Sequence, residues 1–128
     1  MNGSAEVIVA LDREWAARID AHDLDGVVEL YDKEGSFLLP GQPPLEGHGP
    51  IRSAWQHLFG LPEFKLRFES LAVIVASGDD IAVDRGPYEL SYRGENGLSV
   101  EKGKYLVIWC KNDAQHWKIL ADMFNNNG

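Results

Sequence analysis

One acidic side chain interrupts an apolar stretch near the end of the sequence. Asp122 lies between Leu120 and Phe124 at the two-residue spacing of a β-strand, so these three side chains share one face. Burial without a partner would raise the pKa of the Asp122 carboxyl and suit it for acid or base chemistry. A lysine or tyrosine partner would instead hold the carboxyl ionised, and a structural carboxylate bonded to Trp15 or to a tyrosine is the alternative. Asp122 is therefore the candidate catalytic residue and the candidate anchor for a ligand.

Aromatic side chains alternate in two segments that precede Asp122. Tyr88 and Leu90 share a face in the first segment. Tyr105, Val107 and Trp109 share a face in the second. Such rows fit the wall of an enclosed space better than a surface exposed to water. Aromatic ring faces attract cations, so rings around one carboxyl would suit an amine or quaternary ammonium, with a hydroxylated ligand as the alternative.

The elements that would position these side chains follow from hydrophobic periodicity. Apolar residues at three- and four-residue spacing, among them Trp15 and Ile19, indicate amphipathic helices, and after Pro62 the spacing falls toward two. We expect helices over residues 5–21, 24–31 and 49–59, with Ser4 as the first N-cap. We expect strands over residues 35–40, 64–77, 81–93, 98–111 and 115–125. Turn residues join the last four segments, which should therefore pair as an antiparallel meander.

This order of elements predicts an α+β fold, with three N-terminal helices packed on a strongly curved antiparallel sheet. The length suits one domain over residues 1–128. A cone that helices close on one side leaves a cavity, which is where small-molecule sites usually lie. The other face of the last strand carries Ile119, Ala121 and Met123, so it should also be covered. A homodimer through the convex sheet face is the simplest cover.

Composition and charge exclude several classes of function. The 12 basic and 20 acidic residues give a net charge of −8, which disfavours nucleic acid as a partner. No apolar run is long enough to span a membrane and no signal peptide is recognisable, so a cytoplasmic location is expected. Cys110 is the one cysteine and lies in an apolar run typical of an inert, buried thiol. The histidines lack the spacing of a metal site, so neither a metal nor a cofactor is expected.

Several motifs resemble the nuclear-transport-factor-2-like superfamily of cone-shaped α+β domains. They are the first helix with Trp15, the turn from His22 to Tyr31, the strand that ends at Pro40, and Gly47 before a helix. Later motifs resemble its SnoaL-like (DUF4440), polyketide-cyclase-like branch, and these are Gly86 with Tyr88, residues 103–109 and residues 117–122. The resemblance spans nearly the whole chain. It implies a fold and a branch rather than one activity, because such folds host many functions.

The turn after the first helix also resembles the ketosteroid isomerases. Laid on that family, the oxyanion-hole tyrosine falls at Trp15, the catalytic aspartate at Leu39 and the second oxyanion acid near Val107. Leucine and valine can neither take a proton nor donate to an oxyanion, so ketosteroid isomerase activity is not expected. The overlay and the strand parity together predict a pocket lined by Trp15, Ile19, Tyr88, Leu90, Tyr105, Val107, Trp109, Leu120, Asp122 and Phe124.

These observations leave three functions open. The first is binding of an unidentified small molecule, with Asp122 as the polar anchor. The second is an isomerase, cyclase or hydratase without a cofactor, in which Asp122 moves a proton while Tyr88 or Tyr105 stabilises an oxyanion. The third is a protein-association module that uses the convex sheet face, in which case side chains should fill the pocket.

Overall fold

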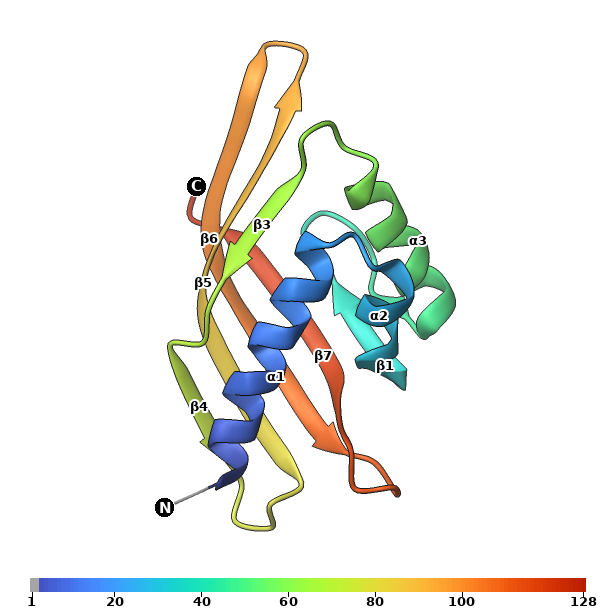
Figure 1. The fold of residues 1–128 in the computed structure, drawn as a ribbon, viewed down its shortest axis with the longest axis vertical. Helices are drawn as coiled ribbons and strands as arrows, with labels where there is room; N and C mark the ends of the chain where they lie inside the picture. Colours follow the sequence, from blue (N-terminus) through green and yellow to red (C-terminus); the bar gives the residue numbers. More distant parts are fainter. Residues whose placement is uncertain (1–2) are drawn as a thin grey trace.

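The computed structural model describes residues 3–128, in which helices cover one face of a curved sheet (Figure 1). The helices are α1 (Gly3–Asp20), α2 (Leu24–Glu29) and α3 (His48–Phe59). The strands are β1 (Tyr31–Leu38), β2 (Leu45–Glu46), β3 (Lys65–Phe68), β4 (Ala72–Val75), β5 (Ile81–Gly94), β6 (Gly97–Lys111) and β7 (Trp117–Asn126). The predicted α+β architecture is confirmed. Among the described helices, none is long and apolar enough to cross a membrane.

The strands form one sheet in the order β2-β1-β7-β6-β5-β3, with β4 also paired to β5. The long strands β5, β6 and β7 form the predicted antiparallel meander. The segment expected as one strand over residues 64–77 is instead two short strands, β3 and β4. Between these strands the chain passes over Gly86, where a Cβ atom would overlap the carbonyl oxygen of Glu69. Glycine therefore permits this close crossing.

The boundary between α2 and β1 differs from the expectation in a way that matters for the site. The helix ends at Glu29, where the Leu30 N–H closes the last turn on the carbonyls of Val27 and Val28. The sequence pattern predicts Tyr31 as the last residue of the helix. In the structure it is the first residue of β1, which pairs in parallel with β7. Pairing with β7 outweighs the helical periodicity of this short segment. The outcome is that Tyr31 faces the interior, fully buried.

A bulge in β7 breaks the strict alternation that the sequence suggested. Val107 pairs with Asp122, but two residues further along β6 Trp109 pairs with Ile119, so one extra residue lies on β7. Ile119 is therefore fully buried on the inner side with Asp122, whereas Leu120 is only partly buried. The expectation that Leu120 faces the cavity with Asp122 is wrong, because parity is lost at the bulge. Ser4, expected as the N-cap, lies inside α1.

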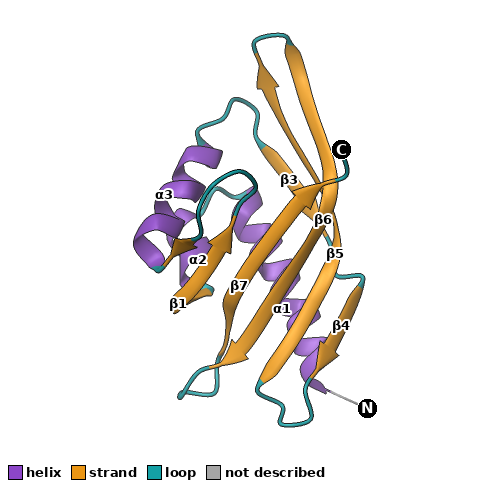
Figure 2. Cartoon of the chain, turned by 180° about the vertical axis from the view of Figure 1, so that it is seen from behind, coloured by secondary structure: helices purple, strands orange, loops and turns teal. Residues whose placement is uncertain are grey.

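The sheet face opposite the helices is left open within this chain (Figure 2). Its side chains include Ile74 on β4, Leu106 on β6 and Met123 on β7, which are 69%, 39% and 40% exposed. Leu106 and Met123 are direct partners across β6 and β7. Apolar side chains in register on neighbouring strands thus form an outward apolar row.

The close crossing at Gly86 predicts a large effect from a one-atom change. We expect Gly86→Ala to lower the free energy of unfolding by about 1–3 kcal/mol, because the added methyl group displaces the Glu69 backbone. Gly49→Ala is the matched control, since no atom lies within 4 Å of its Cβ position in α3. Urea unfolding of both variants measures the difference. Equal stability of the two variants would contradict the crossing.

Candidate functional site

A small cavity lies between the helices and the inner face of the sheet. Its volume is about 40 Å³. It is lined by Trp15, Phe37, Trp55, Leu58, Leu66, Phe68, Tyr88, Leu90, Tyr105, Asp122 and Phe124. One water occupies roughly 10–15 Å³ on this measure, whereas pockets for drug-sized ligands span ~300–1,000 Å³. The cavity therefore holds a small chemical group as it stands, and a larger ligand requires its walls to move.

Asp122 supplies the carboxyl group of the cavity wall. Its Oδ2 atom accepts a hydrogen bond of 2.6 Å from the Tyr31 hydroxyl, and that hydroxyl accepts one of 3.1 Å from Trp55 Nε1. Burial raises the pKa of the Asp122 carboxyl to about 7, although the bond from Tyr31 opposes the rise. At neutral pH this carboxyl therefore exists in both protonation states, as an acid–base group requires.

Three different elements hold this hydrogen-bonded chain in place. Trp55 comes from α3, Tyr31 from the start of β1 and Asp122 from β7. The Nε2 atom of His48, at the start of α3, lies 2.7 Å from the backbone carbonyl oxygen of Tyr31. This contact connects α3 to the same residue. Burial and the neighbouring Asp122 raise the pKa of Tyr31 well above its usual value, so its hydroxyl stays a donor.

A second buried acidic cluster joins α1 to the sheet. Asp12 Oδ2 accepts hydrogen bonds from the Tyr105 hydroxyl at 2.9 Å and from Ser70 Oγ at 3.1 Å. Ser70 Oγ also lies 2.8 Å from Asp84 Oδ1. Burial is the main cause that raises the pKa of Asp12 to about 8, and the charge of Asp84 adds to it. Trp109 Nε1 donates a longer bond of 3.5 Å to Asp84 Oδ2.

Ser70 links the two carboxyls of this cluster. Its hydroxyl has one hydrogen and lies within bonding distance of both Asp12 and Asp84. It can donate to one carboxyl at a time. Because burial and the charge of Asp84 raise the pKa of Asp12 to about 8, Asp12 keeps a proton at neutral pH with which it can donate to a neighbouring acceptor.

The structure brings six of the predicted pocket residues to the cavity wall. They are Trp15, Tyr88, Leu90, Tyr105, Asp122 and Phe124. Ile19, Val107 and Trp109 are buried in the adjoining core and do not line the cavity. Leu120 lies at the bulge in β7, away from it. The wall residues that the sequence did not indicate are Phe37, Trp55, Leu58, Leu66 and Phe68.

The two tyrosines expected to stabilise an oxyanion have other partners. The Tyr105 hydroxyl bonds to Asp12, and the Tyr88 hydroxyl donates to Glu101 Oε2 at 2.6 Å. Neither hydroxyl donates a hydrogen bond to Asp122. The donor to Asp122 is the Tyr31 hydroxyl instead. The sequence pattern predicts Tyr31 in a helix. No residue near Tyr31 in the sequence therefore indicates its hydrogen bond to Asp122. Asp12 was detectable in principle, because it lies one turn from Ile8 and Trp15 on the buried stripe of α1.

Within residues 3–128, no group of three or more histidine, cysteine or acidic side chains is arranged to hold a metal ion. Cys110 is partly buried rather than fully buried, and it lies on the outward side of β6. Burial raises the pKa of its thiol, which keeps the thiol protonated and unreactive.

Comparisons with known proteins place the chain among proteins of this fold. A structure of a ketosteroid isomerase-like protein from Erwinia carotovora atroseptica SCRI1043 is 18% identical, covers 100% of this chain and 99% of its own, and has a TM-score of 0.87. A nuclear transport factor 2-like superfamily protein from Salmonella enterica serovar Typhimurium is 16% identical, covers 98% and 92%, and has a TM-score of 0.82. A protein with a cystatin-like fold from Novosphingobium aromaticivorans is 15% identical, covers 95% and 80%, and has a TM-score of 0.78.

At these identities the likeness extends to the fold alone. No curated protein matches the chain. The model of the SnoaL-like domain family matches residues 13–115, which is most of the sequence. The resemblance to the nuclear-transport-factor-2-like superfamily and its SnoaL-like branch is therefore confirmed, and the chain belongs to the SnoaL-like domain family, with a nuclear-transport-factor-2-like fold.

Proposed function

We propose that this chain binds a compact, mainly apolar small molecule in the cavity beneath α1, with one polar group of the ligand at Asp122. One observation carries the proposal: a buried carboxyl lies in a wall otherwise built from aromatic and aliphatic side chains. Among residues 3–128, the side-chain hydrogen bond to Asp122 is made at Oδ2, by Tyr31. The surface that faces the cavity is apolar, so a ligand donor reaches Asp122 Oδ1 once the wall has moved. A buried carboxylate oxygen gains from each donor it receives.

Entry of a ligand requires the wall to open, because about 40 Å³ admits only a small group. Leu58, Leu66 and Phe124 line the cavity and are partly exposed, so they form its rim. Rotation of exposed side chains takes place within nanoseconds, and it leaves the backbone of the sheet unchanged. We therefore assign the movement to these rim residues rather than to the buried Trp55 or Tyr31.

Acid–base catalysis in the same cavity is the second candidate function. Its supporting observation is that the pKa of Asp122 is about 7, at which a carboxyl both gives and takes protons near neutral pH. A reaction without a cofactor, such as an isomerisation, cyclisation or hydration, needs no more than such a group and a donor for the developing charge. Tyr31, at 2.6 Å from Asp122, is the donor in reach.

A protein-association module is the third candidate, and the small volume of the cavity favours it. A domain that only supports contacts between proteins has no need for an open pocket, and the cavity here is only about 40 Å³. A binding experiment with small fragments separates this function from the first two.

The outward sheet face supports a homodimer as the assembly in which the cavity works. Leu106 faces Met123 across β6 and β7, and Ile108 lies between Ala121 and Val83 in the next outward row. Covering this row with the same row of a second copy removes both from water at once, which is the self-complementary contact of a two-fold dimer. Charged side chains at the end of this face, such as Lys104, would stay at the rim of the contact.

The binding proposal predicts that a cavity-filling substitution blocks small ligands. We expect benzylamine or benzyl alcohol to raise the melting temperature of the wild-type protein in a saturable way. Leu90→Trp should remove that rise, because Leu90 lines the cavity. Leu98→Trp is the matched control, since Leu98 is exposed at the far end of β6 and should leave the rise intact. Absence of any rise in the wild type would favour the association module.

The state of Asp122 predicts how stability changes with pH. Its folded pKa of about 7 lies above its ordinary value of 3.8, so the protonated carboxyl favours folding and that contribution is lost as pH rises from about 4 to 7. Asp122→Asn should remove this loss, at roughly 1.4 kcal/mol for each unit of pKa difference. Urea unfolding of both proteins at pH 5 and pH 8 measures it. Parallel pH profiles would mean that Asp122 is ionised throughout.

The dimer predicts that one charge on the outward face separates the subunits. Leu106→Asp should convert a dimer into a monomer, because an unpaired carboxylate would be buried in the contact. Val7→Asp, on the exposed side of α1, should leave the dimer intact. Light scattering coupled to size-exclusion chromatography reports the mass of each. A wild-type protein that is monomeric at high micromolar concentration would rule the dimer out.

A further inference from the structure

The interior of this domain contains acidic groups without a buried counter-cation. Asp12, Asp84 and Asp122 are 3%, 0% and 4% exposed. They are the buried charged side chains of residues 3–128, and no lysine, arginine or histidine of that range is buried with them. Charged groups are normally buried only when an opposite charge or hydrogen bonds compensate the loss of water. An interior of this kind is therefore short of positive charge.

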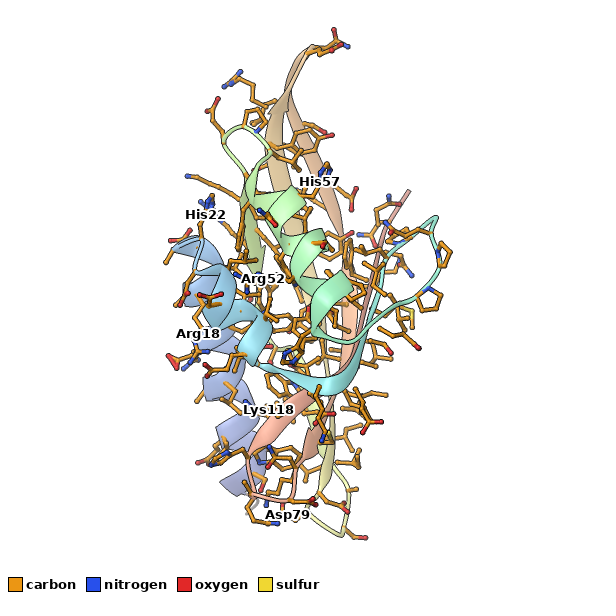
Figure 3. All side chains as sticks on the ribbon, turned by 90° about the vertical axis from the view of Figure 1, so that its right-hand side faces the viewer. Arg18, His22, Arg52, His57, Asp79 and Lys118 are labelled. Atoms are coloured by element: carbon orange, nitrogen blue, oxygen red, sulfur yellow. The ribbon has the colours of Figure 1, made fainter. Side chains whose placement is uncertain are left out.

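Three basic residues on or beside the helices, Arg18, Arg52 and Lys118, have partners near the surface instead. Arg52 binds the carboxylate of Asp25 at 2.6 Å, and Arg18 donates to the carbonyl oxygen of Gly26. Lys118 donates to the carbonyl oxygen of Glu29 at 2.9 Å. Figure 3 labels these three basic side chains along the helices and the start of β7. They lie among solvent-exposed partners, so none compensates the buried acids.

The three acids face one interior. Val107 pairs with Asp84 on one side and with Asp122 on the other, so the two acids stand in one row across β5, β6 and β7. Strands in a sheet lie ~4.8 Å apart, which puts the two backbones roughly 10 Å from each other. Asp12 reaches the same row from α1, through Ser70 and Tyr105. The charge of Asp84 accordingly contributes to the raised pKa of Asp122.

Within residues 3–128, the titratable groups around Asp122 include no lysine or arginine. They are Asp12 from α1, Tyr31 from β1, Asp84 and Tyr88 from β5, Tyr105 from β6 and, behind Tyr31, His48 from α3. The three tyrosines keep their protons, since burial and nearby carboxylates raise the pKa of each. Asp84 stands in the same row as Asp122, and its charge is one of the causes that raise the pKa of Asp122. The field at Asp122 therefore attracts a cation.

The walls of the cavity suit a cation as well. Trp15 packs edge-on against Phe68 with ring centroids 5.2 Å apart, and Phe37 stacks on Trp55 at 5.5 Å. Tyr88 meets Phe124 edge-on at 5.2 Å. The face of an aromatic ring carries partial negative charge and attracts ammonium groups, most strongly where water is excluded. Rings and carboxyl together provide the two kinds of contact that an organic cation makes.

We propose that the ligand of this cavity is a positively charged amine, whose ammonium group binds Asp122 between the aromatic walls while the Asp12–Asp84 pair adds negative potential behind it. The inference rests on the proposed binding function and names its ligand class. Asp122 Oδ1 accepts from the ammonium, and Tyr31 stays bonded to Oδ2. The apolar part of the amine lies against the rim residues.

Two probes of the same shape test the inference: benzylamine, which carries a positive charge, and benzyl alcohol, which does not. Isothermal titration calorimetry at pH 7.5 should give a dissociation constant for benzylamine at least tenfold lower than for benzyl alcohol. Asp122→Asn should raise the benzylamine constant to near that of the alcohol and change the alcohol constant less than threefold. Asp122→Asn keeps the size of the side chain and its bond from Tyr31, so it isolates the charge.

The pH dependence gives a second readout that needs no variant. The ammonium binds the ionised carboxyl, so benzylamine affinity should rise about tenfold per unit between pH 5 and 7, up to the pKa of Asp122 of about 7. It should level off above that pH, while the alcohol affinity stays flat. Equal binding of amine and alcohol, or a flat amine profile, would overturn the cationic ligand and leave the binding function standing. Binding of neither probe would overturn both.

Discussion

Burying carboxyl groups in an aromatic interior is the constraint around which this structure is organised. Each buried acid needs a donor or a proton of its own, because water is excluded. Asp122 accepts a hydrogen bond from the Tyr31 hydroxyl, and Trp55 Nε1 donates a hydrogen bond to that hydroxyl. Asp12 and Asp84 both lie within hydrogen-bonding distance of Ser70, and Asp12 also accepts from Tyr105. These bonds connect α1, α3, β1, β5 and β7, so the same interactions that compensate the acids also fix how the helices sit on the sheet.

Local periodicity was sufficient to predict the architecture and half of the site. Helix and strand spacing gave the three helices, the long meander and the inward rows that contain Tyr88 and Tyr105, because these depend on neighbours along the chain. Tyr31 and Leu120 show where that reasoning ends. Tyr31 joins β1 because β1 pairs with β7, about ninety residues away in sequence. Leu120 does not belong to the inner row because of a bulge in β7, and no residue type in the sequence indicates that bulge. Both facts arise from long-range pairing.

The family assignment and the site carry different kinds of information. The SnoaL-like fold supplies a cone with helices on one side, and such a scaffold hosts unrelated functions. The ketosteroid isomerase pattern fails here at Leu39 and Val107, yet Asp84 and Asp122 flank Val107 on the two neighbouring strands. Of these two acids, Asp122 lines the cavity and Asp84 does not.

The central claim is that the Asp122 carboxyl is held in a cavity, away from water and from the basic side chains of residues 3–128, with Tyr31 as its donor. Its protonation can be followed directly by the carbon-13 chemical shift of the Asp122 carboxyl during a pH titration by NMR. We predict a midpoint near pH 7, and a higher midpoint in Tyr31→Phe, because the Tyr31 bond lowers this pKa. A midpoint near 4 in the wild type would place the carboxyl in water or beside a cation, and would contradict the account.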